Sequence, residues 1–512
     1  MCTLGNSSSA AHTSRRAPAM NTHPSSVGSS AWLVLILVTL GGCAAGPNFV
    51  RPAPLEADRY TTKAMPATTV PADGQAQAFT LGGTLNADWW RRFESAQLDA
   101  MVQQALTNNP TLQAAEASLR QSRNNLRAGY GLFFPQVGVE FDAVRERSAP
   151  LAQGVQASPS VFNLITLSGT ISYALDVFGR ERRTVEGLKA QVDYQGYLSK
   201  AAYLTLSANV VNTGIARAAY AAEVRATEEL IELQQQQLQS TEVAVRAGTT
   251  PYADVLSLHA LIAANQATLA PLRQKISQTE DLLASLEGVV PSKANLPDID
   301  LAALSLPLDL PVSVPSDLAR QRPDILSSEA ELHAASANIG VATAAMFPSI
   351  GLSATYGGAG SSFGSLSATN GRFWSIGPSV SIPVFQGGKL WYGRKAAIDA
   401  YQAALANYRQ TVLDAFAQVA DSLKALEHDA QALQAEADAQ RAAGEALKLL
   451  QINYRAGLVA YLDVWAADVQ LHLATIGYLQ AVGQRYQDTV ALFVALGGGW
   501  WNESRPANPA AP

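Results

Sequence analysis

A duplicated segment constrains this chain more than any other feature of its sequence. Residues 245–255 (VRAGTTPYADV) return as residues 454–464 (YRAGLVAYLDV). Ala/Leu/Gln-rich stretches of helical period flank both copies, so the glycine at each junction indicates a helix C-cap that opens a tight turn. Other segments recur at nearly the same offset, namely Phe134-Pro135 as Phe347-Pro348, Asp176-Val-Phe178 as Pro383-Val-Phe385, and Asn109-Pro110 as Arg322-Pro323. The chain is therefore predicted to hold two copies of one architecture, each with a helix-hairpin tip.

The N-terminus resembles a secretion signal. Residues 31–40 form a nearly apolar run that is too short to span a bilayer as a helix but fits the h-region of a signal peptide. Leu40-Gly-Gly-Cys43 follows directly and resembles the bacterial lipobox, where the chain is cut before a cysteine that carries lipid. We expect residues 1–42 to be removed and Cys43 to be lipidated, with Met1 or Met20 as the start. A twin-arginine signal at Arg15-Arg16 and a buried, unmodified Cys43 are the alternatives.

Composition argues against several classes of function. The chain carries 36 Lys and Arg against 42 Asp and Glu, and this mildly acidic balance without a basic stripe argues against nucleic-acid binding. Cys2 lies in the segment to be removed, so a lipidated Cys43 leaves no thiol for a disulfide. Residues 358–364 miss the dinucleotide pattern by one residue, and nothing resembles a nucleophile elbow. The remaining histidines lack metal-ligand spacing: His259, His333, His428 and His472. We expect no enzyme, no metal site and no cofactor.

Four segments alternate apolar and polar residues with period two: about 136–145, 166–177, 349–357 and 373–384. This pattern predicts strands with one apolar and one polar face, which suits a soluble sandwich or a membrane barrel with a wet lumen. Their length favours the barrel, because a tilted strand needs roughly 9–11 residues to cross hydrocarbon. The loops around 149–160 and 358–372 are long and rich in Gly, Ser and Ala. Aromatic residues at the strand ends fit an interfacial girdle: Phe133, Phe134, Phe178, Phe347 and Phe385.

The helices decide how many chains share the barrel. Four strands cannot close a barrel, since even small ones need about eight, so several chains must combine. Residues from about 181 to 246 and from about 390 to 455 contain no proline, and each stretch predicts a helix of about 100 Å. The second stretch has a heptad pattern typical of coiled-coil packing at Leu405, Val412, Val419, Leu426 and Leu433.

Shorter helices would stack in pairs beside these long ones, over about 98–128, 252–287, 317–346 and 461–495. Each chain would then supply four helical columns. Three chains would give twelve strands and twelve columns around a lumen of roughly 25 Å, whereas two chains would leave little more than half that bore. The expected fold class is an α+β membrane protein with an internal two-fold repeat.

These segments divide the chain into five parts. Residues 1–42 are the signal peptide, and residues 43–88, rich in Pro, Ala and Thr, are an extended leader. The first repeat covers 89–300 and the second covers 301–501. Residues 502–512 are expected to form a flexible tail.

Together these features resemble the TolC-like outer-membrane efflux duct family, specifically its lipoprotein (NodT-type) branch. The resemblance covers nearly all of residues 43–501. It is carried by motifs in a fixed order: the lipobox with Gly46-Pro-Asn-Phe49, Trp89-Trp90 with Phe93, the two Phe-Pro strand starts, Val177-Phe-Gly179 and Val384-Phe-Gln-Gly387, the two Arg-Ala-Gly tips, and residues 495–500 (ALGGGW). It implies a homotrimer whose twelve-stranded barrel in outer-membrane lipid continues into a periplasmic helical barrel, docked on a membrane-fusion adaptor and an inner-membrane pump.

The resemblance further implies the exit duct of a tripartite efflux pump, which passively conducts small molecules such as drugs. A type I protein-secretion duct shares this architecture, and a bore of this size does not decide between the two. A non-transporting coiled-coil lipoprotein that bridges the envelope is the alternative from another class. Such a tether has no use for strands with a polar face, so the conduit is favoured.

The tips are expected to contact the adaptor through Arg246, Gly248, Arg455 and Gly457. A cation at this place suits the last carbonyls of a helix as well as an incoming partner loop. Simple helix capping by the arginines is the alternative.

A gate is expected at the second tip, where threefold symmetry would bring copies of inward-facing residues together. In the resemblance, Asp463 matches the aspartate that rings the closed aperture, and Tyr454 matches a tyrosine that holds the helices shut. Val459 and Ala466 depart from the pattern, because some family members carry a gating arginine and a second aspartate there. Apolar packing by Leu458, Val459 and Leu462 is therefore expected to do more of the closing. The alternative is that Asp463, like Asp254, only begins the following helix as an N-terminal acid.

Overall fold

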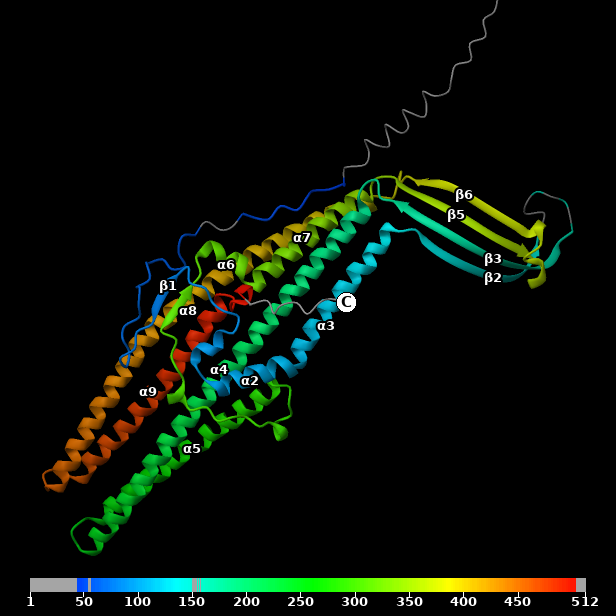
Figure 1. Cartoon of the computed structure of the whole chain (residues 1–512). Helices are drawn as coiled ribbons and strands as arrows, with labels where there is room; N and C mark the ends of the chain where they lie inside the picture. The colour runs from blue at the N-terminus through cyan, green and yellow to red at the C-terminus, as the bar shows by residue number, and fades with distance from the viewer. Residues whose placement is uncertain (1–43, 54–56, 150–153, 155, 157, 503–512) are drawn as a thin grey trace, which may run out of the picture.

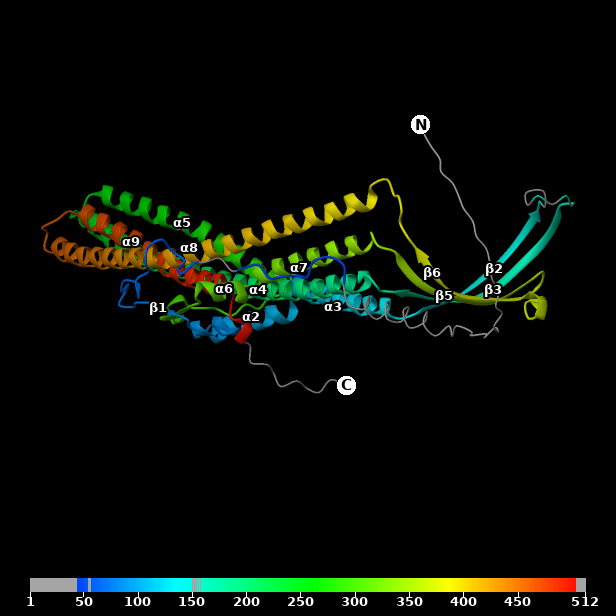
Figure 2. The ribbon, with the colours of Figure 1, turned by 90° about the horizontal axis from the view of Figure 1, so that it is seen from above.

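The computed structural model describes residues 44–53, 57–149, 154, 156 and 158–502. The expected signal peptide 1–42, the lipidation site Cys43 and residues 503–512 of the expected tail lie outside the described residues. The described chain is elongated, with a sheet at one end and two helix-turn-helix tips at the other (Figures 1 and 2).

The same series of elements occurs twice along the chain. The first series is α2 (Ala96–Asn108), α3 (Pro110–Tyr130), β2 (Gln136–Ser148), β3 (Ser160–Leu175), α4 (Arg180–Arg246) and α5 (Tyr252–Leu286). The second is α6 (Pro315–Gln321), α7 (Pro323–Ala344), β5 (Ser349–Gly360), β6 (Arg372–Ser381), α8 (Lys389–Arg455) and α9 (Tyr461–Ala495). Short 3-10 turns connect them: Trp89–Phe93, Gly131–Phe133, Pro291–Lys293, Leu301–Ala303, Phe363–Ser365, Thr369–Gly371 and Trp500–Asn502.

The four long strands form one antiparallel sheet in the order β2-β3-β5-β6. The register places Val139, Gly169, Tyr356 and Trp374 in one row across the sheet, on the face that also carries Val137, Ile171 and Ile376. This apolar face is exposed, with 76% of Val139 and 73% of Trp374 accessible. The opposite face carries Glu140, Thr170, Thr355 and Ser375. An apolar face that is exposed over most of the sheet indicates that this face contacts lipid.

The strands of the first hairpin are longer at their outer ends than the sequence indicated, whereas β6 is shorter at its helix end. β2 ends at Ser148 rather than near 145 and β3 begins at Ser160 rather than near 166, which agrees with the loop expected around 149–160. β6 ends at Ser381 rather than near 384, because Pro383 has no N–H to donate to a ladder. Within the described residues, β2 and β6 each have only one strand partner, so both edges of the sheet are open.

The two long helices, α4 and α8, each have 67 residues. Each starts after a glycine in the left-handed region, Gly179 at φ 79° and Gly388 at φ 83°. The heptad residues of α8 are buried from Val412 to Leu433. Helix α5 is long and apolar enough to cross a membrane by length and composition, but it packs along α4 (Figure 1).

The expectation of one continuous helix over about 98–128, and of another over about 317–346, is wrong. The first is broken at Asn109-Pro110 and the second at Arg322-Pro323. Proline starts α3 and α7 because its missing N–H costs nothing in the first turn of a helix. The Asn109 side chain also caps α3, accepting the N–H groups of Thr111 and Leu112 at 2.9 and 3.1 Å.

The leader is more than an extended spacer, because its described residues run beside the helices (Figure 1) and contact them at several points. Arg183 of α4 is 5% exposed and donates to the Asn48 side chain at 2.8 Å and to Glu186 at 2.6 Å. Phe49 stacks on His333 of α7 at 4.3 Å. Farther along, β1 (Ala78–Leu81) pairs in parallel with β4 (Asp309–Val312). A Pro/Ala/Thr-rich composition indicated an extended chain, but it did not reveal these long-range partners.

Candidate functional site

The two tips are closed by the glycines that the sequence singled out. Gly248 has φ 75° and Gly457 has φ 73°, a region that other residues rarely adopt. At the first tip, Thr249 N donates to Ala244 O and Gly248 N to Val245 O, both at 3.0 Å, which is the Schellman pattern. Arg246 and Arg455 are exposed in the last turns before these glycines. Both tips therefore present an exposed arginine beside a closed turn.

The expected gate residues all lie in or next to the turn of the second tip, between Tyr454 and Asp463. Leu458 is 73% exposed and Leu462 is 62% exposed, so the single chain leaves an apolar surface there. The Tyr454 ring lies 5.4 Å from Tyr461, edge to face, across the turn. Sequence reasoning missed Tyr461, although its place opposite Tyr454 in the hairpin is the signal that could have found it.

Asp463 is exposed, and its Oδ2 atom accepts the backbone N–H of Ala460 at 3.0 Å. This contact gives Asp463 the N-terminal capping role that the sequence left as an alternative. In the single chain the carboxylate thus stabilises the start of α9. A capping bond occupies one carboxylate oxygen and leaves the other for an additional role.

Polar contacts that the sequence did not reveal join the two hairpins along α4 and α9. Gln234 donates to Asp468 at 3.0 Å and accepts from Asn265 of α5 at 3.0 Å. Nearer the middle of the molecule, Gln480 donates to Glu223 at 3.2 Å. Burial raises the pKa of both carboxyl groups, Asp468 and Glu223. Helical periodicity reports which face of a helix is buried but not which helix covers it, so these pairs needed the tertiary structure.

The carboxyl groups of Asp429 on α8 and Asp488 on α9 lie near each other. Burial, followed by a hydrogen bond with Asp488 and its negative charge, raises the pKa of Asp429 to about 8, while the charge of Arg485 opposes the shift. Arg485 is 1% exposed and donates to the Gln77 side chain at 3.0 Å and to Gln75 O at 3.1 Å, which ties the leader to α9. Burial and the nearby charge of Asp488 therefore favour the protonated form of Asp429.

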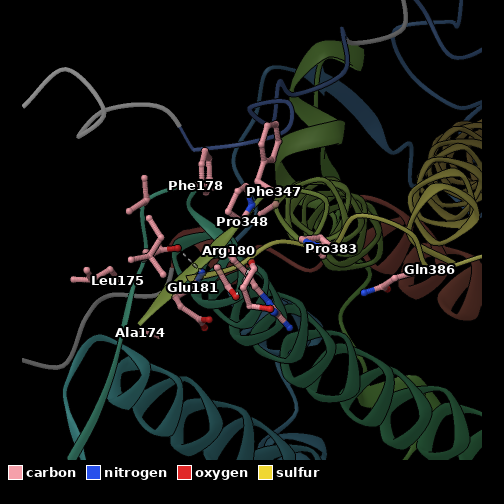
Figure 3. A pocket seen from close by; sticks show the side chains of 16 residues that line it. Ala174, Leu175, Phe178, Arg180, Glu181, Phe347, Pro348, Pro383 and Gln386 are labelled. Atoms are coloured by element: carbon pink, nitrogen blue, oxygen red, sulfur yellow. Dashed lines mark hydrogen bonds between the residues drawn. The ribbon is translucent and has the colours of Figure 1, made fainter. Parts of the chain in front are cut away.

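The junction between sheet and helices holds a cavity of about 270 Å³ (Figure 3). Its upper rim is the stacked pair of Phe178 and Phe347, 4.8 Å apart, which were expected in an aromatic girdle. Asp176 caps α4 by accepting the N–H groups of Glu181 at 3.0 Å and Arg182 at 2.9 Å. Beside this rim, Ala45 N donates to Phe178 O at 2.8 Å.

The other expected girdle residues also lie at this junction, where Phe134 is 66% and Phe385 is 88% exposed. The junction is therefore the level at which the apolar sheet face begins. Among the described residues, no group of three or more His, Cys, Asp or Glu side chains could hold a metal ion.

Fold and site together define a class of protein: a protomer of a membrane barrel that continues into long helices ending in closed tips. The outer membrane efflux protein family matches residues 101–289 and 314–498, and the chain belongs to this family. This confirms the family resemblance predicted from the sequence.

Named relatives agree with this assignment. Pyoverdine export outer membrane protein OpmQ of Pseudomonas putida is 28% identical over 423 residues, covering 81% of this chain and 89% of the relative. Toluene efflux pump outer membrane protein TtgC of the same species is 28% identical over 486 residues, covering 94% and 97%. The solved outer-membrane channel OprN superposes with a TM-score of 0.79 at 28% identity, covering 90% of this chain and 100% of that one.

The predicted fold class is confirmed, because the chain has the α+β fold of the trimeric outer-membrane efflux channels. The predicted function is confirmed as well: the chain is the outer-membrane exit duct of an efflux system. Members of this family are channels rather than enzymes.

The raised pKa of Asp429 predicts a pH dependence of stability. A pKa of about 8 in the folded chain lies above the usual value of about 4, so the folded state binds the proton more tightly than the unfolded state. Stability is then fully present below pH 4 and is lost as pH rises through about 8. Asp429→Asn should leave thermal unfolding almost unchanged at pH 5 and raise its midpoint by roughly 2–4 °C at pH 9, as followed by circular dichroism.

The control for this prediction is Asp421→Asn, an exposed aspartate on the same helix. Equal unfolding midpoints of wild type and Asp429→Asn at both pH values would contradict the raised pKa of Asp429.

Proposed function

We propose that three copies of this chain form a closed duct that passively conducts small molecules from the periplasm through the outer membrane. The observation that carries this proposal is the four-stranded sheet with two open edges and one lipid-suited face. Open edges are not tolerated in lipid, because their N–H and C=O groups find no partner there. Pairing β2 of one chain with β6 of the next satisfies these groups and gives a barrel of twelve strands.

The small-molecule class is supported by the names of the relatives, which refer to pyoverdine export and toluene efflux. The polar face of the sheet, with Glu140, Asp142, Thr170 and Ser375, would line the lumen and keep it wet. The duct itself needs no catalytic group, and the partners that supply energy are a periplasmic membrane-fusion adaptor and an inner-membrane pump. No nucleic acid takes part.

The adaptor would dock at the tips, on Arg246 and Gly248 of the first hairpin and Arg455 and Gly457 of the second. Both turns are fully exposed at the end of the molecule farthest from the sheet, where an adaptor in the periplasm would reach them (Figure 1). The exposed arginines offer a partner loop hydrogen-bond donors and positive charge.

The gate would lie at the second tip. There Tyr454, Leu458, Val459 and Leu462 would close the mouth by apolar packing, and Asp463 would form an acidic ring when three chains meet. Val459 cannot form the ion pair of an arginine lock, and the exposure of Leu458 and Leu462 supports packing between chains instead. The Gln234–Asp468 and Gln480–Glu223 bonds would hold the second hairpin against the first in the closed state.

The lipid anchor would be Cys43. Ala44, the next residue, lies against Gly179 at the start of α4, so the anchor would enter the membrane at the base of the barrel. The bond from Ala45 N to Phe178 O fixes the chain at that level.

The trimer and the anchor are tested together with Cys43→Ser. Because the barrel inserts by its own apolar face, this variant should lose palmitate labelling and still sediment as a membrane-derived trimer in mild detergent. If analytical ultracentrifugation of the wild type gives monomers or dimers, the twelve-stranded barrel is wrong. Undiminished palmitate labelling of Cys43→Ser would exclude Cys43 as the anchor.

The tips are tested with Gly457→Val, since a β-branched residue at φ 73° costs about 1–2 kcal/mol and should distort the turn. Export of a dye by cells that carry the complete pump should fall several-fold while trimer assembly is unchanged. Gly393→Val is the matched control, because a Cβ there meets nothing within 4 Å and the residue is exposed. Export that stays at the wild-type level in Gly457→Val would remove the docking role.

The gate is tested in planar bilayers with Asp463→Ala. A ring of carboxylates favours cations and binds divalent ions, so the variant should lose cation selectivity and block by added divalent metal. Asp254→Ala, at the corresponding place on the first tip, should behave as the wild type. If Asp463→Ala also keeps its selectivity and its block, no acidic ring exists.

A further inference from the structure

The alternation of β2 separates its charges by sign. Successive side chains of a strand point to opposite faces, so the acids share the polar face: Glu140, Asp142 and Glu146. Arg145 and Arg147 share the face of Val137, Val139 and Phe141 instead. On the other edge strand, Arg372 lies opposite Gly358, on this same apolar face. The acids of β2 therefore face the lumen, and three arginines face the lipid.

These arginines stand at the outer end of the apolar band. Arg145 is the tenth residue of β2 counted from the helix end, and Arg372 is the last of the ten residues of β6 counted in the same direction. For a strand tilted by about 40°, nine steps rise about 23 Å, close to the roughly 25 Å height of the apolar band. At that level a guanidinium lies among lipid headgroups rather than hydrocarbon. All three arginines are exposed.

A cavity of about 460 Å³ lies beside Arg372 on the same face. Its apolar lining comes from three strands and the β5–β6 loop, through Val139, Leu167, Tyr356 and Leu366. The loop lies on the sheet because Gly358 has no side chain, so its backbone meets the carbonyl of Leu366. Phe363 holds the loop there by stacking on Phe141, with ring centroids 5.8 Å apart.

The guanidinium groups keep most of their donors free. Arg372 uses one nitrogen, Nη2, to donate to Ser367 O at 3.2 Å. Within the described ranges, no carboxylate forms an ion pair with Arg145, Arg147 or Arg372. A guanidinium presents five N–H donors in a fork that matches a phosphate group. An apolar cavity open to lipid, next to unpaired cations at headgroup level, has the chemistry of a lipid site.

We propose that this face binds an anionic, phosphorylated lipid of the outer leaflet, with its phosphate on the arginines and one acyl chain in the cavity at Val139, Leu167 and Tyr356. The site goes beyond the duct function. It rests on the proposed trimer in one respect: pairing of β2 with β6 of another copy brings Arg145 and Arg147 next to Arg372 of that copy. Each interface between protomers then carries one basic cluster, formed by Arg145 and Arg147 of one copy and Arg372 of the next, and a bound lipid contacts both protomers.

The test is native mass spectrometry of the detergent-solubilised full chain, titrated with a bisphosphorylated glycolipid and with the same lipid after removal of its phosphates. The wild type should bind the phosphorylated form at least tenfold more tightly. A basic residue near an anionic surface contributes about fivefold in affinity, so Arg372→Gln should weaken binding about fivefold and Arg145→Gln/Arg147→Gln/Arg372→Gln roughly a hundredfold. Arg123→Gln, an exposed arginine of α3 outside the barrel, is the charge-matched control.

A second variant tests the cavity. Gly358→Val should displace the loop from the sheet and weaken binding of the acyl chain without changing any charge; if it does not fold, the arginine variants decide. Equal binding of both lipid forms, or a triple variant that binds as the wild type, overturns the proposal. Displacement of the lipid by millimolar inorganic phosphate alone also overturns it, since the site would then be one for free phosphate. The triple variant should remain a conducting trimer; a wild type without trimers or conductance would contradict the proposed duct, whatever the lipid result.

Discussion

The structure depends on one constraint: backbone N–H and C=O groups in lipid must find partners within protein. The described sheet satisfies this rule for β3 and β5, which pair on both sides, and leaves it unsatisfied at the outer edges of β2 and β6. Neither edge can stay open in hydrocarbon, so the chain requires other copies of itself. The same assembly involves α4 and α8, because each copy must add the same two long helices to one closed helical wall.

The contacts that hold the helical part together differ along its length. Near the sheet, Arg183 joins the leader to α4, and Phe49 stacks on His333 of α7. Toward the tips, the hairpins are joined by amide–carboxyl bonds such as Gln234–Asp468. A buried cation with several acceptors costs much more to separate than a neutral amide with one carboxyl group. The contacts near the sheet are therefore stronger than those toward the tips.

Charge follows the geometry of the strands as well. Acids on one face and arginines on the other give a single β-strand two environments, a wet lumen and a lipid headgroup layer. The same alternation that makes β2 amphipathic thus also determines where its ionised groups lie. At the second tip, Asp463 uses one carboxylate oxygen to stabilise the start of α9, which leaves the other oxygen for a further contact.

The sequence by itself determined the local features, since each depends on backbone spacing alone. Period two identified the strands, the long proline-free stretches identified α4 and α8, a heptad pattern further supported α8, and Gly248 and Gly457 marked the turns. It did not show that Asn109-Pro110 breaks a helix, that the leader docks on Arg183, or that Gln234 meets Asp468. Nor did it place Tyr461 against Tyr454. Those features depend on which distant segments pack together, and local periodicity carries no information about a partner's identity. Only the tertiary structure decided them.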